Sequence, residues 1–278
     1  MDIIQKCTHP IRIVDRSNGG YMYVPCGHCQ ACITSYRSMW LQRLDAEAKS
    51  SKAVLFFTLT YDNDNVPSLT YDSGCNALFS NRSKSDDIYL DDYNFQLKSG
   101  LLNININSLP LLQNDKSIHP RVGYACKADV QKFIKRLRRR LDYDTKNLIS
   151  YVSSTCRSFR YFITSEYGPC TYRPHYHGLL YFNNIDVAKA VEKHYLRESW
   201  QFCDKQNVDI SQVQTNASSY VSKYVRCDTR IPDLLKIPSK TSSFFLCSRK
   251  PAIGNLPFDK VLGIFFVLSI PVLSFFNS

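Results

Sequence analysis

The chain has 278 residues, of which 44% are hydrophobic and 21% are charged. This balance is typical of a globular protein, and it excludes a chain too polar to bury a core. The formal net charge of +11 and the pI of about 9.1 indicate a polyanionic partner, most often nucleic acid. Charge of this kind predicts association and says nothing about the fold.

Closely spaced cysteines mark the start of the chain. The candidate ligands of a structural zinc site are Cys7, Cys26, Cys29 and Cys32. The last three follow a C-x2-C-x2-C spacing, and four soft ligands would close a tetrahedral site, with His9 or His28 as an alternative nitrogen ligand. Free reduced thiols and a redox role are the other interpretations. Because the cysteine count of 11 is odd and the first residues lack the apolar segment of a signal peptide, we expect a reducing, cytoplasmic setting.

A helix, a strand and a long polar stretch are predicted next. Residues 36–48 predict a short helix, and residues 54–61, which are rich in β-branched and aromatic side chains, predict a buried strand. Residues 62–125 are dominated by Asn, Asp and Ser, and this stretch is too long for an ordinary loop. We interpret it as an insertion that is partly disordered.

The second half of the chain predicts alternating helices and strands. Apolar residues spaced three or four apart over residues 129–141 predict an amphipathic helix. The later predictions are strands at 160–166 and 175–182, a helix at 187–200, a short strand at 208–213 and a helix at 216–225. Gly168 and Pro169 separate the first two strands, which are antiparallel if they form a hairpin. The order predicts an α+β fold with an antiparallel central sheet and helices on one face.

Two histidines flank one bulky residue at the start of the predicted strand at 175–182. Residues i and i+2 of a strand point to the same face, so His175 and His177 can meet one metal ion while Tyr176 packs in the core. Glu166 ends the preceding strand, and in a hairpin its carboxylate would lie beside them. Two imidazoles and one carboxylate suit Mn²⁺, Mg²⁺ or Zn²⁺. The alternatives are a pair of surface or core-edge histidines and an ordinary solvated acid.

Two tyrosines lie four residues apart in the last predicted helix. Tyr220 and Tyr224 would share one helix face with Lys223 between them, so two phenols could face one site. Tyr has an unperturbed pKa of about 10, so a metal ion or Lys223 would help to form the phenolate. The alternatives are core or surface packing for the tyrosines and a solvated helix position for the lysine.

Four motifs occur in an order that resembles the HUH endonucleases. They are Phe-Thr-Leu-Thr-Tyr at 57–61, Glu-Tyr-Gly at 166–168, Pro-His-Tyr-His at 174–177 and Tyr-Val-Ser-Lys-Tyr at 220–224. Within that superfamily the chain is similar to the rolling-circle replication initiators of microviruses, small single-stranded DNA phages, and in particular to the gokushovirus-like group. Cys-Gly-His-Cys-Gln-Ala-Cys at 26–32 and Ser-Arg-Lys-Pro-Ala-Ile-Gly at 248–254 also match that group. The resemblance covers roughly residues 20–61 and 127–254.

The resemblance implies a sequence-specific enzyme that nicks and rejoins single-stranded DNA to start and end rolling-circle replication of a circular phage genome. It would bind Mg²⁺ or Mn²⁺ and pass through a 5′-phosphotyrosine. The implied metal ligands are His175, His177 and Glu166, and the implied catalytic residues are Tyr220, Tyr224 and Lys223. The fold would be the ferredoxin-like or RRM-like palm of the superfamily. The implied partners are a single-stranded or supercoiled circular DNA origin and the host helicase and polymerase, in the host cell cytoplasm and without a small-molecule cofactor.

DNA contacts are expected from the basic helix and from the first buried strand. The residues expected to contact DNA are Lys132, Lys135, Arg136, Arg138, Arg139, Arg140, Thr58 and Thr60. In this interpretation the helix adjoins the site, so its charges would contact phosphates and binding should weaken as salt rises. A solvated helix face and a simple core strand are the alternatives.

The implied organisation has three parts. Residues 1–50 form the Cys-rich segment and a short helix, residues 51–230 form the endonuclease domain with an insertion at 62–125, and residues 231–278 form a C-terminal tail. The tail ends in an apolar run at 261–276, which we interpret as a buried strand pair or a loosely packed tail rather than a membrane anchor. The rival functions are an HUH transposase or plasmid relaxase, which often uses one Tyr, and a non-catalytic zinc-containing nucleic-acid-binding protein.

Overall fold

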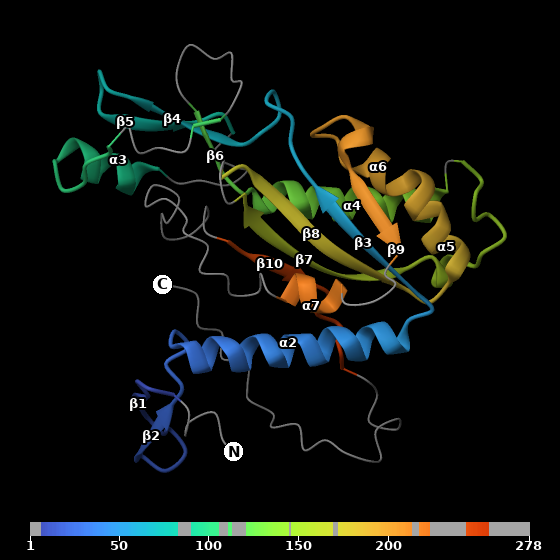
Figure 1. Cartoon of the computed structure of the whole chain (residues 1–278), viewed down its shortest axis with the longest axis horizontal. Helices are drawn as coiled ribbons and strands as arrows, with labels where there is room; N and C mark the ends of the chain where they lie inside the picture. The colour runs from blue at the N-terminus through green and yellow to red at the C-terminus, as the bar shows by residue number, and fades with distance from the viewer. Residues whose placement is uncertain are drawn as a thin grey trace.

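The computed structural model describes residues 7–82, 90–105, 111–112, 121–144, 146–168, 172–212, 217–222 and 243–255. Its centre is a five-stranded sheet in the order β10-β7-β8-β3-β9 (Figure 1). The strands are β3 (Ala53–Leu59), β7 (Phe159–Tyr167), β8 (Pro174–Phe182), β9 (Asp209–Gln212) and β10 (Phe245–Cys247). Every neighbouring pair is antiparallel, which confirms the predicted α+β class with an antiparallel central sheet.

The strands β7 and β8 form the hairpin that carries the candidate site. Glu166 pairs with His175 and Phe159 pairs with Phe182, so the two strands are in register over their full length. Apolar side chains occur on both faces of these strands, and most of their residues are buried. A strand that is apolar on both faces needs a covering layer on each side.

Helices cover one face of the sheet. They are α4 (Lys127–Tyr143), α5 (Ile185–Ala190) and α6 (Leu196–Ser199), and a π-helical turn at Val191–Tyr195 joins the last two. Phe133 of α4 contacts the rings of Phe57 and Trp200 at centroid distances of 5.8 and 5.9 Å, in the main core. These elements match the helices predicted at 129–141 and 187–200, apart from the π-helical turn.

The opposite face of the sheet is covered by α2 (Gln30–Ser50) and α7 (Ala217–Ser222). Trp40 of α2 and Val221 of α7 are buried against Phe162 in a second core. The prediction placed the helices on one face, and the structure adds this second layer. The reason is that alternate residues of β7 and β8 are apolar on this side as well.

The stretch predicted as an insertion contains a second antiparallel sheet. Its elements are β4 (Ser68–Asp72), β5 (Ala77–Ser80), α3 (Asp91–Lys98) and β6 (Arg121–Gly123), and the strand order is β5-β4-β6. Leu69, Leu97 and Val122 from these elements join the main core. The described part of the stretch is therefore folded, because scattered leucines and valines reach the core despite the polar composition.

Part of the segment predicted as a C-terminal tail belongs to the fold. β10 pairs with β7, and Ile253 is buried beside α2. Gly254, with a φ of 69°, donates its backbone N–H to Glu47 Oε2 at 2.8 Å. A side chain at position 254 would collide with Arg43, which explains the glycine. The apolar run at 261–276 lies outside the described residues, and among those described no helix is long and apolar enough to cross a membrane.

A short hairpin precedes α2. Its strands are β1 (Ile11–Val14) and β2 (Tyr21–Val24), which pair in an antiparallel register. Figure 1 shows this hairpin at the start of α2, beyond one end of the main sheet. None of its residues belongs to the main core or to the second core.

Candidate functional site

Glu166, His175 and His177 converge at one end of the β7–β8 hairpin. Glu166 and His175 are cross-strand partners, and His177 lies two residues further along the same face of β8. Glu166 Oε2 lies 3.1 Å from His175 Nε2 and 2.9 Å from His177 Nε2. The three ligand atoms are within 4.8 Å of one another, so one ion could bind all three. We call these residues the Glu/His/His group.

The other ring nitrogens of the two histidines are held by neighbouring groups. His175 Nδ1 lies 3.1 Å from the carbonyl oxygen of Arg173, and His177 Nδ1 lies 3.0 Å from the hydroxyl of Thr58. Because a carbonyl only accepts, His175 donates to it from Nδ1, so Nε2 is the nitrogen whose lone pair can bind a metal once it carries no proton. Phe56 stacks on the His177 ring at a centroid distance of 5.8 Å. Contacts of this kind fix the orientation of metal-binding imidazoles.

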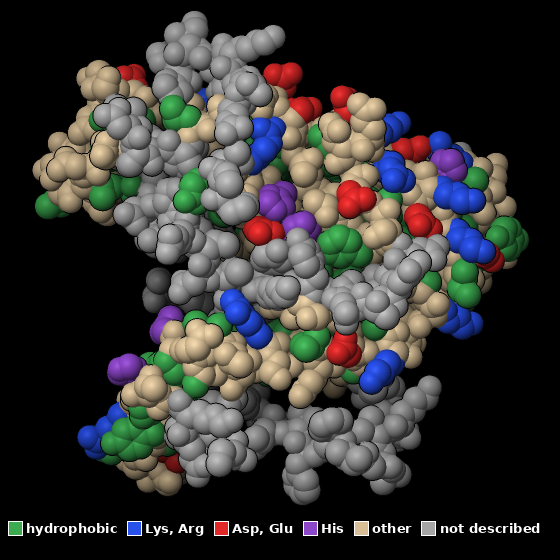
Figure 2. Space-filling model, in the orientation of Figure 1, with side chains coloured by type: hydrophobic (Ala, Val, Ile, Leu, Met, Phe, Trp, Pro, Cys, Tyr) green, Lys and Arg blue, Asp and Glu red, His purple; other side chains and the backbone are tan. Residues whose placement is uncertain are grey.

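The carboxylate of Glu166 is ionised in this setting. Burial on its own would raise the pKa of Glu166, but hydrogen bonds from His175 and His177 outweigh burial and lower the pKa to about 2. The side chains of Glu166, His175 and His177 are 14%, 21% and 8% exposed. The group is therefore open on one side, and Figure 2 shows histidine side chains at the surface beside an acidic one in the middle of the view. A phosphate can reach such a group from solvent.

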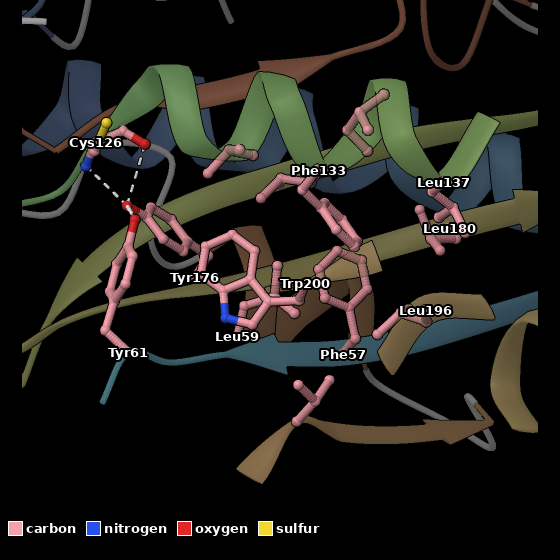
Figure 3. Close-up of a cluster of buried hydrophobic side chains, with 14 of the residues drawn as sticks. Phe57, Leu59, Tyr61, Cys126, Phe133, Leu137, Tyr176, Leu180, Leu196 and Trp200 are labelled. Atoms are coloured by element: carbon pink, nitrogen blue, oxygen red, sulfur yellow. Dashed lines mark hydrogen bonds between the residues drawn. The ribbon is translucent and has the colours of Figure 1, made fainter. Parts of the chain in front are cut away.

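Tyr176 lies between the two histidines but on the other face of β8. It is fully buried, and its hydroxyl accepts a hydrogen bond from the backbone N–H of Cys126 at 2.8 Å (Figure 3). It also pairs with the hydroxyl of Tyr61 at 2.9 Å, and Tyr61 donates to Asp129 at 3.0 Å. The predicted core position of Tyr176 is confirmed. Its hydrogen bonds tie β8 to the start of α4 and so fix the strand that carries the two histidines.

The helix that contains Tyr220 packs on the same face of the sheet as the histidines. α7 shares the second core with Leu179, which points to the same face of β8 as His177. Tyr220 lies in α7, but its side chain is outside the described residues, and so are Lys223 and Tyr224. The catalytic roles predicted for these three residues therefore stay predictions.

Four cysteine sulfurs meet at the start of α2. The cysteines are Cys7, Cys26, Cys29 and Cys32, and their Sγ atoms lie within 4.8 Å of one another. The sulfurs of Cys26 and Cys32 are 4.0 Å apart. Those of Cys7 and Cys29 are 3.9 Å apart, and the edge of a ZnS4 tetrahedron is about 3.8 Å. Cys7 thus lies beside the other three cysteines, as predicted. The side chains of His9 and His28, the alternative ligands, are exposed. We call these residues the four-cysteine group.

Backbone N–H groups point at these sulfurs. The N–H of Cys26 donates to Cys7 Sγ at 3.3 Å, and the N–H of Cys29 donates to Cys26 Sγ at 3.3 Å. Gly27 has a φ of 78°, which turns the chain between two ligands. Backbone hydrogen bonds lower the pKa of Cys29 to about 5, whereas burial raises the pKa of Cys32 to about 12. A stabilised thiolate and N–H···S bonds suit a metal-binding turn.

The basic face of α4 does not adjoin the Glu/His/His group. α4 packs on the face of the sheet opposite to His177, as the alternation of side chains along β8 requires. The predicted adjacency is therefore wrong, because the charge pattern of a helix does not tell which face of a sheet it covers.

Part of the positive charge of α4 is also paired with groups within the protein. Arg136 donates to the carbonyl of Ser199 at 2.8 Å, and Arg140 pairs with Glu198 at 3.2 Å. The other predicted basic residues, Lys132, Lys135, Arg138 and Arg139, are exposed.

The two threonines predicted to contact DNA have partners within the protein. Thr58 is opposite His177 in the sheet and holds its ring. Thr60 lies just beyond β3, and its hydroxyl donates to the carbonyl of Asn207 at 3.5 Å. Direct DNA contact by these threonines stays a prediction. The carbonyl of Arg173 is a site group that the sequence does not predict, since a main-chain contact leaves no residue-type signal.

Comparison with known proteins points to replication. A family model described as Replication-associated protein, of the ORF2 type, matches residues 117–229, which include α4, the β7–β8 hairpin and α7. No curated protein and no solved structure matches the chain. The Glu/His/His group lies inside the matched region, and the four-cysteine group lies outside it. Over this region the chain is similar to replication-associated proteins of the rolling-circle initiator type.

Proposed function

We propose that the protein nicks and rejoins single-stranded DNA to initiate and terminate rolling-circle replication of a circular phage genome. The observation that carries the proposal is the convergence of Glu166, His175 and His177 on the sheet face covered by α7, the helix that contains Tyr220. The match to a replication-associated family over the same region supports it. A host helicase and polymerase in the host cytoplasm would complete the replication reaction.

The donor atoms of the Glu/His/His group fit Mg²⁺ or Mn²⁺. Glu166 supplies an anionic oxygen, and the two imidazoles present Nε2 atoms whose directions are set by Thr58 and by the carbonyl of Arg173. An ion bound here would polarise the scissile phosphate and stabilise charge on the leaving oxygen. The exposed side of the group leaves space for that phosphate.

The tyrosines would supply the nucleophiles in this proposal. The phenol of Tyr220 or Tyr224 loses its proton, and its oxygen attacks the phosphorus in line. A 5′-phosphotyrosine forms, the P–O3′ bond breaks, and the 3′ oxygen takes up a proton to become the primer hydroxyl. Lys223 would stabilise the phenolate. The second tyrosine would cut the regenerated origin, after which the freed 3′-hydroxyl attacks the first phosphotyrosine and closes the circle.

The four-cysteine group suits a structural zinc ion. Four thiolates close the coordination of Zn²⁺ and leave no open position for a substrate. The group joins Cys7, four positions before β1, to Cys26 and Cys29 after β2 and to Cys32 in the first turn of α2. We therefore assign this site a role in folding and the Glu/His/His group the role in cleavage.

A covalent-adduct assay tests the proposed function. The full chain with circular single-stranded genome DNA and Mn²⁺ should form a protein–DNA adduct that survives denaturation. The double variant Tyr220→Phe, Tyr224→Phe should form none, and His177→Ala should lose adduct formation while it retains DNA binding. Tyr151→Phe, an exposed tyrosine elsewhere in the chain, is the matched control.

Three outcomes would contradict the proposal. Wild-type protein that binds the DNA but forms no adduct would favour a non-catalytic nucleic-acid-binding protein. An adduct that persists in the double tyrosine variant would show that the nucleophile lies elsewhere. Dependence on only one of the two tyrosines throughout the reaction would favour a transposase or relaxase.

A further inference from the structure

The β1–β2 hairpin exposes large side chains on one of its faces. Tyr21 is 64% exposed, Tyr23 is 57% exposed and Val14 is 59% exposed. Arg12 lies opposite Tyr23 and Val14 lies opposite Tyr21, so the four residues share one face of the hairpin. The guanidinium carbon of Arg12 lies 3.6 Å from the centre of the Tyr21 ring. We call these four residues the aromatic face.

The hairpin needs an external support. Two strands of four residues each are marginally stable at best on their own, and no residue of this hairpin joins either core. Its base is the four-cysteine group, in which Cys7 precedes β1, Cys26 and Cys29 follow β2, and Cys32 lies in α2. The rings of the aromatic face therefore contribute little to folding and are available for a ligand.

The hairpin lies at the same end of the main sheet as the Glu/His/His group. Figure 1 shows the start of α2 at the end of the sheet where β7 ends and β8 begins, and these are the strand ends that carry Glu166 and His175. α2 runs from there to the other end of the sheet, where the N–H of Lys52 donates to the carbonyl of Phe182 at 2.8 Å. A strand of nucleic acid that leaves the group and continues past the start of α2 would meet the hairpin.

The chemistry of the aromatic face fits a single strand of DNA. Unpaired bases stack on exposed tyrosine rings, and arginine contributes both a planar surface and a positive charge for phosphate. The acid of the hairpin turn, Asp15, is engaged locally, because its carboxylate accepts from the N–H of Ser17 at 2.9 Å and from its hydroxyl at 2.6 Å. Duplex DNA keeps its base faces inside the stack and offers none to these rings.

We propose that the aromatic face of the β1–β2 hairpin binds single-stranded DNA that extends from the Glu/His/His group past the start of α2, with the four-cysteine group as its rigid base. The proposal rests on the proposed function for the presence of a single strand at that group. Binding by the hairpin does not itself require cleavage, so the two can be tested apart.

Fluorescence anisotropy of labelled oligothymidylate with the full chain tests the proposal. The double variant Tyr21→Ala, Tyr23→Ala should weaken binding of a long single strand by roughly tenfold per ring. Phe at both positions should keep the wild-type affinity, because the stacking ring remains. Tyr151→Ala is the matched control, since Tyr151 is a tyrosine 72% exposed outside the hairpin.

The support of the hairpin is tested in the same assay. Cys29→Ser should weaken binding of the long strand to a similar extent, whereas Cys75→Ser, at an exposed cysteine outside the four-cysteine group, should not. Unchanged affinity of the double Ala variant for the long strand would overturn the proposal. An equal loss of affinity for duplex DNA would overturn it too, since the rings are expected to stack on unpaired bases.

A short strand that covers only the cleavage position separates this proposal from the nickase. The double Ala variant should still form the covalent adduct on that strand, which also shows that the variant is folded. Loss of the adduct on the short strand in this variant alone would overturn the hairpin proposal in favour of a structural role. If neither the wild type nor any variant forms an adduct, the proposed nicking activity is contradicted. The binding measurements would still decide the hairpin proposal.

Discussion

At the scale of single residues, the two histidines of the Glu/His/His group differ in what orients them. His177 is held by the side chain of Thr58, whereas His175 is held by the main-chain carbonyl of Arg173. Only the first of these interactions can be removed by substitution without moving the backbone. Thr58 is therefore the residue through which the geometry of the group can be tested without touching a ligand.

Replacing Thr58 with Val should lower the affinity for Mn²⁺ by about 10- to 100-fold. Val keeps the shape of the side chain but leaves His177 Nδ1 without its hydroxyl partner. Isothermal titration calorimetry with Mn²⁺ measures the effect, and Thr70→Val in β4 is the matched control. Equal affinity in the Thr58 variant and wild type would show that the hydroxyl does not orient the imidazole.

A second prediction at this scale concerns Asp144, which ends α4 with a φ of 40° and is buried. Its carboxylate accepts from the N–H groups of Leu148 at 3.0 Å and Ile149 at 2.9 Å and from the hydroxyl of Tyr195. Burial alone would raise the pKa of Asp144, but these hydrogen bonds outweigh burial and lower it. The folded pKa therefore lies below the unfolded value of about 3.9.

The stabilisation that Asp144 provides should thus be complete above about pH 4 and be lost as the pH falls through its folded pKa. Asp144→Asn should reduce the free energy of unfolding by about 1.5–3 kcal/mol at neutral pH and by less in acid. Urea unfolding at several pH values measures this difference. A loss of stability that is the same at every pH would contradict the assignment.

At the scale of elements, alternation along β8 separates the site from the core. His175 and His177 point toward the layer of α2 and α7, while Tyr176 and Leu180 point into the main core under α4. Gly178 lies between these positions and is covered by the ring of Phe57, its partner in β3. Its lack of a side chain lets that aromatic ring lie flat on the strand.

Gly178→Ala should destabilise the protein by about 1–3 kcal/mol, because the added methyl group would collide with the ring of Phe57 in a packed core. The midpoint of urea unfolding measures the change. Gly74→Ala is the control, since a methyl group there would meet only a side-chain oxygen of Asp72 at 3.2 Å. Similar midpoints for both variants would show that the core can move aside for the methyl group.

At the scale of the whole molecule, the basic face of α4 is turned away from the candidate site. The exposed lysines and arginines of α4 lie on the far side of the sheet from the Glu/His/His group. With a net charge of +11, long-range attraction of DNA does not depend on that one helix. A contact between α4 and DNA would need a strand long enough to pass around the sheet.

Replacing Lys135, Arg138 and Arg139 with Ala should leave adduct formation on a short strand unchanged. The same variant should bind long DNA more weakly, and the slope of log affinity against log salt should fall by about 0.7 for each phosphate that the variant no longer neutralises. Anisotropy titrations at several salt concentrations measure both quantities. A loss of adduct on the short strand would contradict the placement of α4 away from the site.

Much of the site could be predicted because its signals are local. The i, i+2 spacing of His175 and His177 and the short connection after Glu166 were enough to predict their convergence, and the register of β7 and β8 confirms it. The long separation between Cys7 and Cys26 does not predict that the two residues lie close together. Cys7 was therefore predicted as a zinc ligand from its residue type alone. The structure joins the two by closing the β1–β2 hairpin between them.

Local patterns in the sequence were enough to predict four of the five strands of the central sheet, the helix at 129–141 and the face of β8 on which the two histidines lie. These features follow from residue types and from periods of two or of 3.6 residues. The packing of the folded chain places α4 on the opposite face and α2 on the site face, and it makes the polar stretch a second sheet. Those choices depend on which apolar surfaces meet across the whole chain. A periodic pattern shows that a face will be buried, but not what buries it.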